Sequence, residues 1–289
     1  MNTNLTLKPR IASVDMLRGL VMIIMALDHV RHFFGPEVYE PENLAFTSGP
    51  LFFTRWITHY CAPVFLFLAG TSAFLYLQNT KCATGHLSKF LLTRGVWIIF
   101  IEIFRWNLIV QWIPYQALFL QVLWAIGWSV VILSALVYLP TRWILAIGLL
   151  LIFGHNALDG IRAENLGFWE PFRAFLHQFH SVMLLDVPVV FFYPIIPWVG
   201  VMAGDPEPWT IHERGPFYTF LSILNTEKYP PSLLYLLMTL GPAIMLLSKL
   251  EKWSGPMAEF CIVFGKVPFF FYLLHFAVIH IASAIWSWW

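Results

Sequence analysis

Six side chains recur at helical spacing near the start of the chain, and they include groups suited to proton transfer. They are, in order, Asp15, Arg18, Met22, Met25, His29 and His32. Because residues three and four positions apart share one face of a helix, the spacing predicts a single stripe along one helix. The surrounding sequence is apolar enough to cross a membrane, and ionisable groups in such a helix face protein or a water-filled cavity rather than lipid. We therefore interpret the stripe as one wall of a reaction site.

His29 is the candidate catalytic residue on this stripe. It lies deeper in the predicted helix than His32, and imidazole exchanges protons near neutral pH. A carboxylate can hold a catalytic imidazole in one tautomer. Asp28 is adjacent, but neighbouring side chains on a helix point about 100° apart. The orienting group is therefore expected either from Asp28, reaching around the helix, or from a second helix. His59, at the start of the next predicted helix, is the third candidate catalytic residue.

Charged side chains in the later apolar stretches are candidates for binding substrates. Glu102 and Arg105 are one helical turn apart, and we expect them to pair, because an isolated charge at mid-bilayer costs about 2.5–3.5 kcal/mol. A purely structural ion pair is an equally good interpretation of these two residues. The residues expected to line a substrate channel are Glu102, Arg105, Lys228 and His275. The histidines interpreted as interfacial residues are His32, His155 and His280.

The composition is that of a polytopic membrane protein. Of the 289 residues, 59% are hydrophobic and 11% are charged, and the mean hydropathy is +0.70. These values lie outside the range of soluble globular proteins. We therefore predict an all-α fold in a single transmembrane domain, residues 1–289. The net charge of +1 argues against nucleic acid as a partner. The three cysteines lack the spacing of a metal site or a disulfide framework, so no metal is expected.

About eight apolar stretches are long enough to cross roughly 30 Å of hydrocarbon. The predicted spans are residues 13–34, 53–78, 92–112, 116–138, 142–158, 182–202, 231–249 and 262–287. Cytoplasmic loops carry an excess of Lys and Arg, so Lys8, Arg10 and Arg18 predict a cytoplasmic N-terminus. The chain carries no internal repeat of the kind found in inverted-repeat transporters.

The charge rule conflicts with this span count near the end of the chain. Lys249 and Lys252 predict a cytoplasmic connection between the last two spans. That placement needs one more crossing between residues 202 and 232 than the sequence supplies. Either residues 215–228 re-enter the membrane without crossing it, or a span has been lost at residues 203–204.

Several motifs resemble those of one known family. Three motifs in the first 72 residues are Asp15-Met-Leu-Arg-Gly-Leu, Asp28-His-Val-Arg31, and Thr54-Arg-Trp-Ile-Thr-His59 with the residues that follow to Ser72. This pattern resembles bacterial membrane proteins with a heparan-alpha-glucosaminide N-acetyltransferase-like domain. Three later motifs match it too, and they are Tyr193-Pro-Ile-Ile-Pro-Trp-Val-Gly200, Lys228-Tyr-Pro-Pro-Ser-Leu233 and Gly265-Lys-Val-Pro-Phe-Phe-Phe-Tyr-Leu-Leu-His275. More distantly, the first helix is similar to that of acyltransferase-3-like proteins, in which the histidine matching His29 is taken as catalytic.

The resemblance implies a transmembrane acyltransferase of the bacterial cytoplasmic membrane. Acyl-CoA would serve as co-substrate from the cytoplasmic side, with no tightly bound cofactor, and Arg18 and Arg94 would bind its phosphates. The acceptor would be a glycan or another small polar molecule with an amine or hydroxyl, on the outer side. A homo-oligomer is left open.

The chain also departs from the family pattern in two places. The catalytic histidine of the heparan enzyme lies in the loop after the first helix, and the 35–52 loop here has no histidine. Two motifs that members separate by a span are nearly fused in residues 197–209, which favours the lost span. Two other functions therefore stay open, a transporter or channel for a small polar solute and an inactive remnant that lacks one span.

Overall fold

The computed structural model describes residues 11–35, 41–80, 83–105, 117–154, 158, 160–200, 213–225 and 233–286. The chain packs as two compact units. We call the first the sheet unit, and it comprises Met1–Arg10, Leu66–Gly204 and Tyr229–Leu233. We call the second the histidine unit, and it comprises Ile11–Phe65, Asp205–Lys228 and Leu234–Trp289. Each is described by itself.

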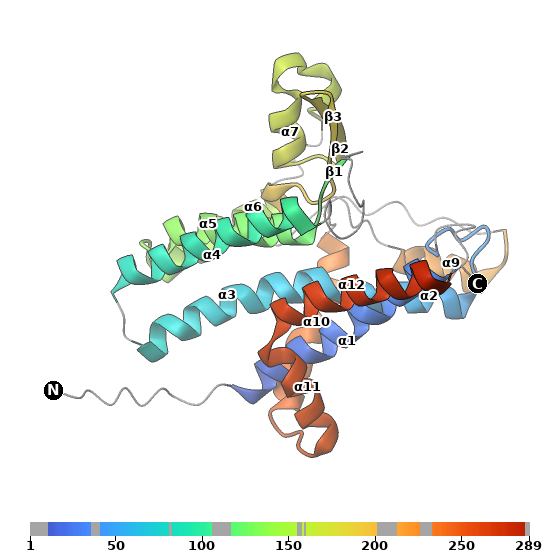
Figure 1. The fold of residues 1–289 in the computed structure, drawn as a ribbon, viewed down its shortest axis with the longest axis horizontal. Helices are drawn as coiled ribbons and strands as arrows, with labels where there is room; N and C mark the ends of the chain where they lie inside the picture. Colours follow the sequence, from blue (N-terminus) through green and yellow to red (C-terminus); the bar gives the residue numbers. More distant parts are fainter. Residues whose placement is uncertain are drawn as a thin grey trace. The chain divides into compact units, whose positions relative to one another are not determined.

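The histidine unit is built from helices. Those described are α1 (Ala12–Phe34), α2 (Gly49–Trp56), the 3-10 helix η1 (Ile57–Tyr60), the start of α3 (Cys61–Thr80), α9 (Pro216–Leu224), α10 (Leu233–Leu250), α11 (Pro256–Lys266) and α12 (Pro268–Trp286). The stretch predicted as the first span forms the helix α1, whose 23 residues extend about 34 Å. Figure 1 shows α11 and α12 alongside α1.

Two glycines let α1 and α11 approach until their backbones touch. A Cβ atom added to Gly19 would lie 1.8 Å from the carbonyl oxygen of Cys261. A Cβ atom added to Gly265 would lie 1.8 Å from the carbonyl oxygen of Asp15. No side chain fits at either distance, so glycine at both positions sets the separation of the two helices.

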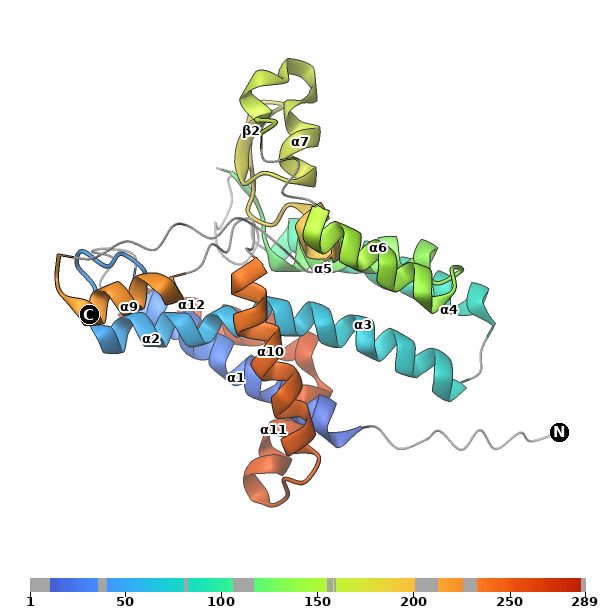
Figure 2. The same ribbon diagram turned by 180° about the vertical axis from the view of Figure 1, so that it is seen from behind.

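The helices α2, η1 and α3 follow one another without a break. The hydroxyl of Ser48 accepts a hydrogen bond from the backbone N–H of Leu51 and so caps α2. The helix α9 lies next to α2 (Figure 2), and the buried side chains of Leu44, Phe52 and Leu221 pack together there.

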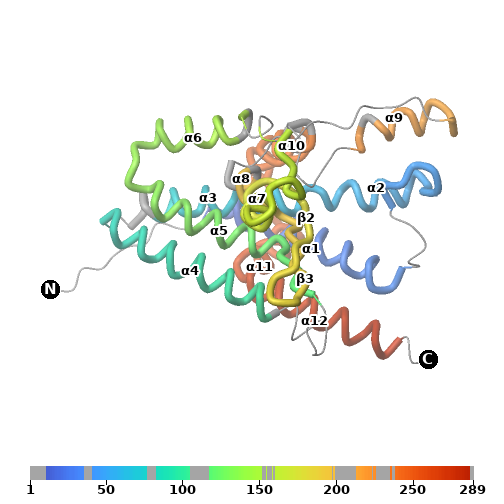
Figure 3. The backbone as a smooth tube through the Cα atoms, turned by 90° about the horizontal axis from the view of Figure 1, so that it is seen from above, coloured from blue at the N-terminus to red at the C-terminus, as the bar shows by residue number. Residues whose placement is uncertain are grey.

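The sheet unit combines helices with a small sheet. Its described elements are α4 (Thr84–Arg105), β1 (Leu118–Leu120), α5 (Val122–Leu136), α6 (Thr141–Gly154), the 3-10 helices η4 (Ala163–Asn165) and η5 (Gly167–Trp169), α7 (Glu170–Leu176), β2 (His180–Leu184), β3 (Val187–Phe191) and α8 (Ile195–Gly200). The helices α4 and α5 pack side by side along their lengths (Figure 3).

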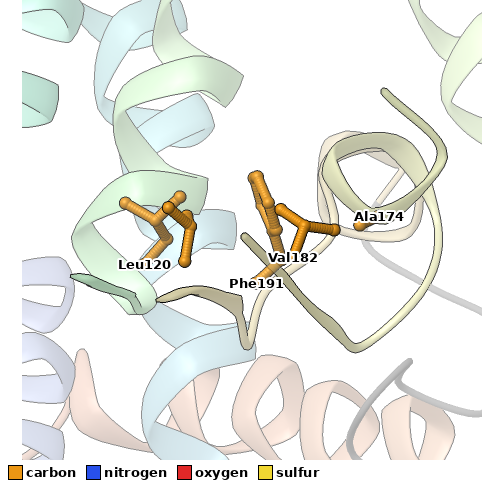
Figure 4. Packing of buried hydrophobic residues seen from close by; sticks show 5 residues of the cluster. Leu120, Ala174, Val182 and Phe191 are labelled. Carbon is orange, nitrogen blue, oxygen red and sulfur yellow. The ribbon is translucent and has the colours of Figure 1, made fainter. Parts of the chain in front are cut away.

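The sheet has the strand order β1-β3-β2, with β1 parallel and β2 antiparallel to β3. The central strand β3 therefore pairs both with its hairpin partner β2 and with β1, whose residue Leu118 lies opposite Val189. Buried side chains of all three strands pack against α7, as Figure 4 shows for Leu120, Val182, Phe191 and Ala174.

Three span predictions need correction. Residues 182–202 do not form a spanning helix, because the described part of this stretch consists of the ends of β2, the strand β3 and the six-residue helix α8. The fold is mostly helical, consistent with the predicted all-α class, and carries a small three-stranded sheet. The predicted span 116–138 begins with the strand β1, so only α5 is helical there. The predicted span 262–287 is divided at Val267 into α11 and α12, since Pro268 lacks the N–H that would continue the first helix.

By length and hydropathy, two helical segments in the described ranges could cross a membrane, and they are Gly49–Tyr76 with 28 residues and Pro268–Trp286 with 19. Shorter apolar helices are Val122–Leu136, Thr141–Leu151 and Met238–Leu250. On α4, the exposed side chains of Trp97, Phe100 and Phe104 recur at helical spacing, as on a surface that faces lipid. The total of eight spans is not confirmed, and the predicted spans other than residues 182–202 stay predictions.

Candidate functional site

A pair of histidines lies between α1 and α12. The Nδ1 atom of His29 is 2.7 Å from the Nε2 atom of His275, although the residues are 246 positions apart. The two rings are nearly parallel, with centroids 5.0 Å apart and an interplanar angle of 10°. This contact of His29 therefore comes from another helix, and its partner is an imidazole.

Aromatic rings fix the position of His275. Phe271 stacks on it with centroids 5.0 Å apart and an interplanar angle of 7°, and Tyr272 and Phe276 meet it edge-on. Its Nδ1 atom is 2.8 Å from the backbone carbonyl oxygen of Phe271. Only 8% of His275 is exposed, so both its position and its ring orientation are set by packing.

Asp28 is engaged in ion pairs and does not orient His29 in this structure. Its Oδ1 atom pairs with Arg31 one turn along α1, and its Oδ2 atom lies 2.9 Å from Nη1 of Arg55 on α2. Arg55 also donates from Nε to Oε1 of Glu42, at 3.1 Å. Two carboxylates and two guanidinium groups thus form a chain of charges beside His29.

His59 closes this chain at its far end. Its Nε2 atom donates to Oε1 of Glu42 at 2.6 Å, and only 2% of the residue is exposed. Tyr235 of α10 donates its hydroxyl proton to the backbone carbonyl of His59 at 2.7 Å. A buried histidine held by a carboxylate can act in proton transfer, and the same contacts also fix the start of α3.

At the other end of α1, Arg18 forms structural contacts. Its Nη1 atom lies 3.1 Å from Oδ1 of Asp15 and donates to the carbonyl oxygen of Gly265 at 3.2 Å. Binding of CoA phosphate by Arg18 stays a prediction.

The predicted site residues of the sheet unit have separate surroundings. Arg94 is exposed and its guanidinium lies 5.1 Å from the ring centroid of Phe90. Glu102 is fully buried and accepts a hydrogen bond from the backbone N–H of Gln121, the N-cap of α5, at 2.8 Å. The side chain of Arg105 and the whole of Lys228 lie outside the described residues, so the expected Glu102–Arg105 pair stays untested.

The stripe of α1 is confirmed except at its end. Asp15, Met22 and Met25 are buried, whereas His32 is exposed. His155 lies outside the described residues. Across those described, no group of three or more His, Cys, Asp or Glu side chains has the geometry of a metal site.

Two residues of the site were missed in the sequence. Arg55 and Glu42 connect Asp28 to His59, yet neither lies on the predicted stripe. The sequence feature that could have indicated Arg55 is its position as a lone cation within the motif around His59. For Glu42 the sequence shows only that the 35–52 loop is acidic, and this does not indicate that Glu42 contacts Arg55 and His59.

The arrangement supports proton transfer at His29 beside a charge network. The buried rings supply a low-dielectric surrounding, in which hydrogen bonds to a charged imidazole are strengthened. All the residues of the histidine pair and the charge network lie in the histidine unit.

The family model for "Heparan-alpha-glucosaminide N-acetyltransferase, catalytic" matches residues 10–204 of the chain. Comparison with curated protein sequences finds no match. Comparison with solved structures finds none either. The matched range contains His29, the charge network and His59, whereas His275 lies beyond it.

Proposed function

Because the chain belongs to the family of heparan-alpha-glucosaminide N-acetyltransferase catalytic domains, we propose that it is a transmembrane enzyme that moves an acyl group from cytoplasmic acyl-CoA to an amine or hydroxyl of a sugar on the outer side of the membrane. The observation that carries this proposal is the His29–His275 pair, which supplies a histidine held by a second ring inside a chain of this family.

His29 would act as the general base. The acceptor nitrogen attacks the thioester carbonyl, so that a C–N bond forms and the C–S bond breaks. His29 takes the proton from the attacking amine and returns it to the sulfur of the leaving CoA. In a second route, His29 first takes the acyl group itself and then passes it to the acceptor.

The length of α1 suits a substrate that reaches in from the cytoplasmic side. Eleven residues separate Arg18 from His29, which is about 16 Å along a helix, and a pantetheine arm can cover that distance. We propose that Arg18 and Arg94 bind the phosphates of CoA. We keep His59 as a candidate catalytic residue. The proposed channel residues are Glu102, Arg105 and Lys228.

The small sheet supports a revised topology. The strand β1 occupies the start of the fourth predicted span, the end that we expect on the outer side, and it pairs with β3. Since paired strands share one side of a membrane, the β2–β3 hairpin belongs on the outer side too. At six residues, α8 is about 9 Å long and cannot cross roughly 30 Å of hydrocarbon. With that crossing removed, Lys249 and Lys252 fall on the cytoplasmic side, and no lost span is needed.

Accessibility of two new cysteines tests this topology. In a variant lacking the native cysteines, Leu185→Cys at the exposed hairpin tip and Lys252→Cys at the end of α10 would each be exposed to a membrane-impermeant maleimide. We expect label at position 185 in intact cells and at position 252 only in inside-out vesicles. Labelling of both positions from the same side would contradict the proposed arrangement.

The activity is tested in sealed proteoliposomes. Radiolabelled acetyl-CoA is supplied on one side and glucosamine, as the probe acceptor, on the other. We expect labelled N-acetylglucosamine on the acceptor side together with free CoA on the donor side. Glucosamine flux without consumption of acetyl-CoA would indicate a transporter, and no product and no flux would indicate the inactive remnant.

A further inference from the structure

We propose that His275 is a positioning residue that holds His29 with its proton on Nδ1, so that Nε2 of His29 is the basic nitrogen. The catalytic consequence rests on the proposed function, whereas the protonation pattern itself follows from the contacts of the two rings. The contacts of the two rings therefore identify which nitrogen of His29 can accept a proton.

The backbone of α12 determines the tautomer of His275. Its Nδ1 atom lies 2.8 Å from the carbonyl oxygen of Phe271. A carbonyl oxygen only accepts hydrogen bonds, so Nδ1 of His275 must carry a proton. A neutral imidazole has one N–H, and Nε2 of His275 is therefore the ring nitrogen with the lone pair.

The tautomer of His29 follows from that of His275. The Nε2 atom of His275 lies 2.7 Å from Nδ1 of His29. One of these atoms must donate, and since Nε2 of His275 has no proton in the neutral ring, Nδ1 of His29 is the donor. The remaining nitrogen of His29, Nε2, then has the lone pair. A free imidazole side chain favours the opposite tautomer, so the pair reverses the intrinsic preference.

Packing prevents the rings from turning away from this arrangement. His275 is enclosed by Phe271 and Phe276 and is 8% exposed. Phe276 also meets His29 edge-on, with centroids 5.0 Å apart and an interplanar angle of 79°. A rotation of either ring would break the hydrogen bond and disturb these aromatic contacts.

The arrangement also stabilises His29 after it takes a proton. The charged imidazole donates from Nδ1 to a neutral acceptor, and hydrogen bonds from charged donors are stronger than those between neutral groups. Asp28 is not needed for this role, because its oxygens pair with Arg31 and Arg55. A neutral imidazole thus takes the place that a carboxylate has in a catalytic triad.

The protonation of His29 can be read directly by NMR of protein in lipid nanodiscs, labelled with 15N and 13C in histidine. The signals of His29 are assigned by their loss in His29→Gln, and the ring carbon Cδ2 identifies Nε2 because it is bonded to that nitrogen. We expect the unprotonated nitrogen of His29 to be Nε2 in the unmodified protein. His275→Phe keeps an aromatic ring and removes the acceptor, so we expect the proton to move to Nε2. His280→Phe on the same helix is the matched control and should change nothing.

A conservative variant separates positioning from folding. The side-chain oxygen of Gln at position 275 can accept from Nδ1 of His29, so His275→Gln should retain the unmodified pattern. If His275→Phe leaves the proton of His29 on Nδ1, or if the unmodified protein carries it on Nε2, the inference is overturned, whether or not the protein is active.

Turnover provides the second readout and distinguishes the two proposals. We expect His275→Phe to lower kcat by about tenfold or more, which is less than the loss of about 10²–10⁴-fold for removing a general base itself. KM for acetyl-CoA should stay unchanged, and His275→Gln should recover part of the rate. An unmodified protein without acyl transfer, but with the expected tautomers, would refute the proposed function and leave the assignment of His275 intact. Unchanged kcat in His275→Phe with a shifted proton would refute its part in catalysis.

Discussion

Arg55 of α2 and Asp28 of α1 form an ion pair in which Nη1 lies 2.9 Å from Oδ2. Arg55 also bonds Glu42, so one guanidinium lies between two carboxylates in a largely buried place. If Arg55 is replaced by a neutral residue, the negative charges of Asp28 and Glu42 lose their shared positive partner. We predict that Arg55→Gln lowers the free energy of unfolding by about 1–3 kcal/mol, measured by denaturant unfolding in detergent.

A double-mutant cycle isolates this ion pair. Asp28→Asn combined with Arg55→Gln should lose less stability than the sum of the two single variants, because the partners interact directly. Lys252→Gln, an exposed change in the same unit, should shift stability by no more than about 0.5 kcal/mol. If the free energy of unfolding lost by the double variant equals the sum of those lost by Asp28→Asn and Arg55→Gln, the ion pair contributes nothing to stability.

The contact between α1 and α11 predicts a strong response to a single methyl group. A Cβ at Gly19 would lie 1.8 Å from a backbone carbonyl oxygen, so the helices must move apart. We expect Gly19→Ala to destabilise the protein by about 1–3 kcal/mol or more, seen as a lower midpoint of thermal unfolding. Gly70→Ala in α3 has open space around it and should be neutral or slightly stabilising. Equal midpoints for the two variants would contradict the close approach.

Glu102 allows its capping contact to be separated from a channel role. It accepts from the N–H of Gln121 at the start of α5. Glu102→Gln keeps an oxygen acceptor and should retain stability, whereas Glu102→Leu leaves the amide without that acceptor and should lose about 1–3 kcal/mol. If Glu102 also lines the channel, Glu102→Gln loses acyl transfer while its unfolding midpoint stays unchanged. Full acyl-transfer activity in Glu102→Gln would contradict the proposal that Glu102 is a channel residue.

The local pattern of α1 was predictable because helical periodicity depends only on nearby residues. The stripe from Asp15 to His29 and its burial follow from steps of three and four. The partners of that stripe were not predictable, since His275, Arg55 and Gly265 come from other helices. A spacing argument along one helix contains no information about which face of another helix packs against it.

Hydropathy alone misassigned residues 182–202. The stretch is apolar, but Leu185 and Asp186 adopt positive φ in the tight turn between β2 and β3. Pro188 and the valines around it suit a strand rather than a helix interior, because proline removes a helical hydrogen bond. Val182, Val189 and Phe191 of this hairpin instead form the small core against α7. The other apolar residues at its turn are exposed, and they are Met183, Leu184 and Leu185. A run of hydrophobic residues therefore does not by itself predict a spanning helix.

The central claim is that His29 performs the proton transfer of an acyltransferase, and His29→Gln tests it most directly. The rate of labelled acetyl transfer from acetyl-CoA to glucosamine is measured in proteoliposomes for the unmodified protein, for His29→Gln and for His32→Gln, an exposed histidine on the same helix. We predict a loss of about 10²–10⁴-fold in His29→Gln and an unchanged rate in His32→Gln. A rate in folded His29→Gln equal to that of the unmodified protein would contradict the account.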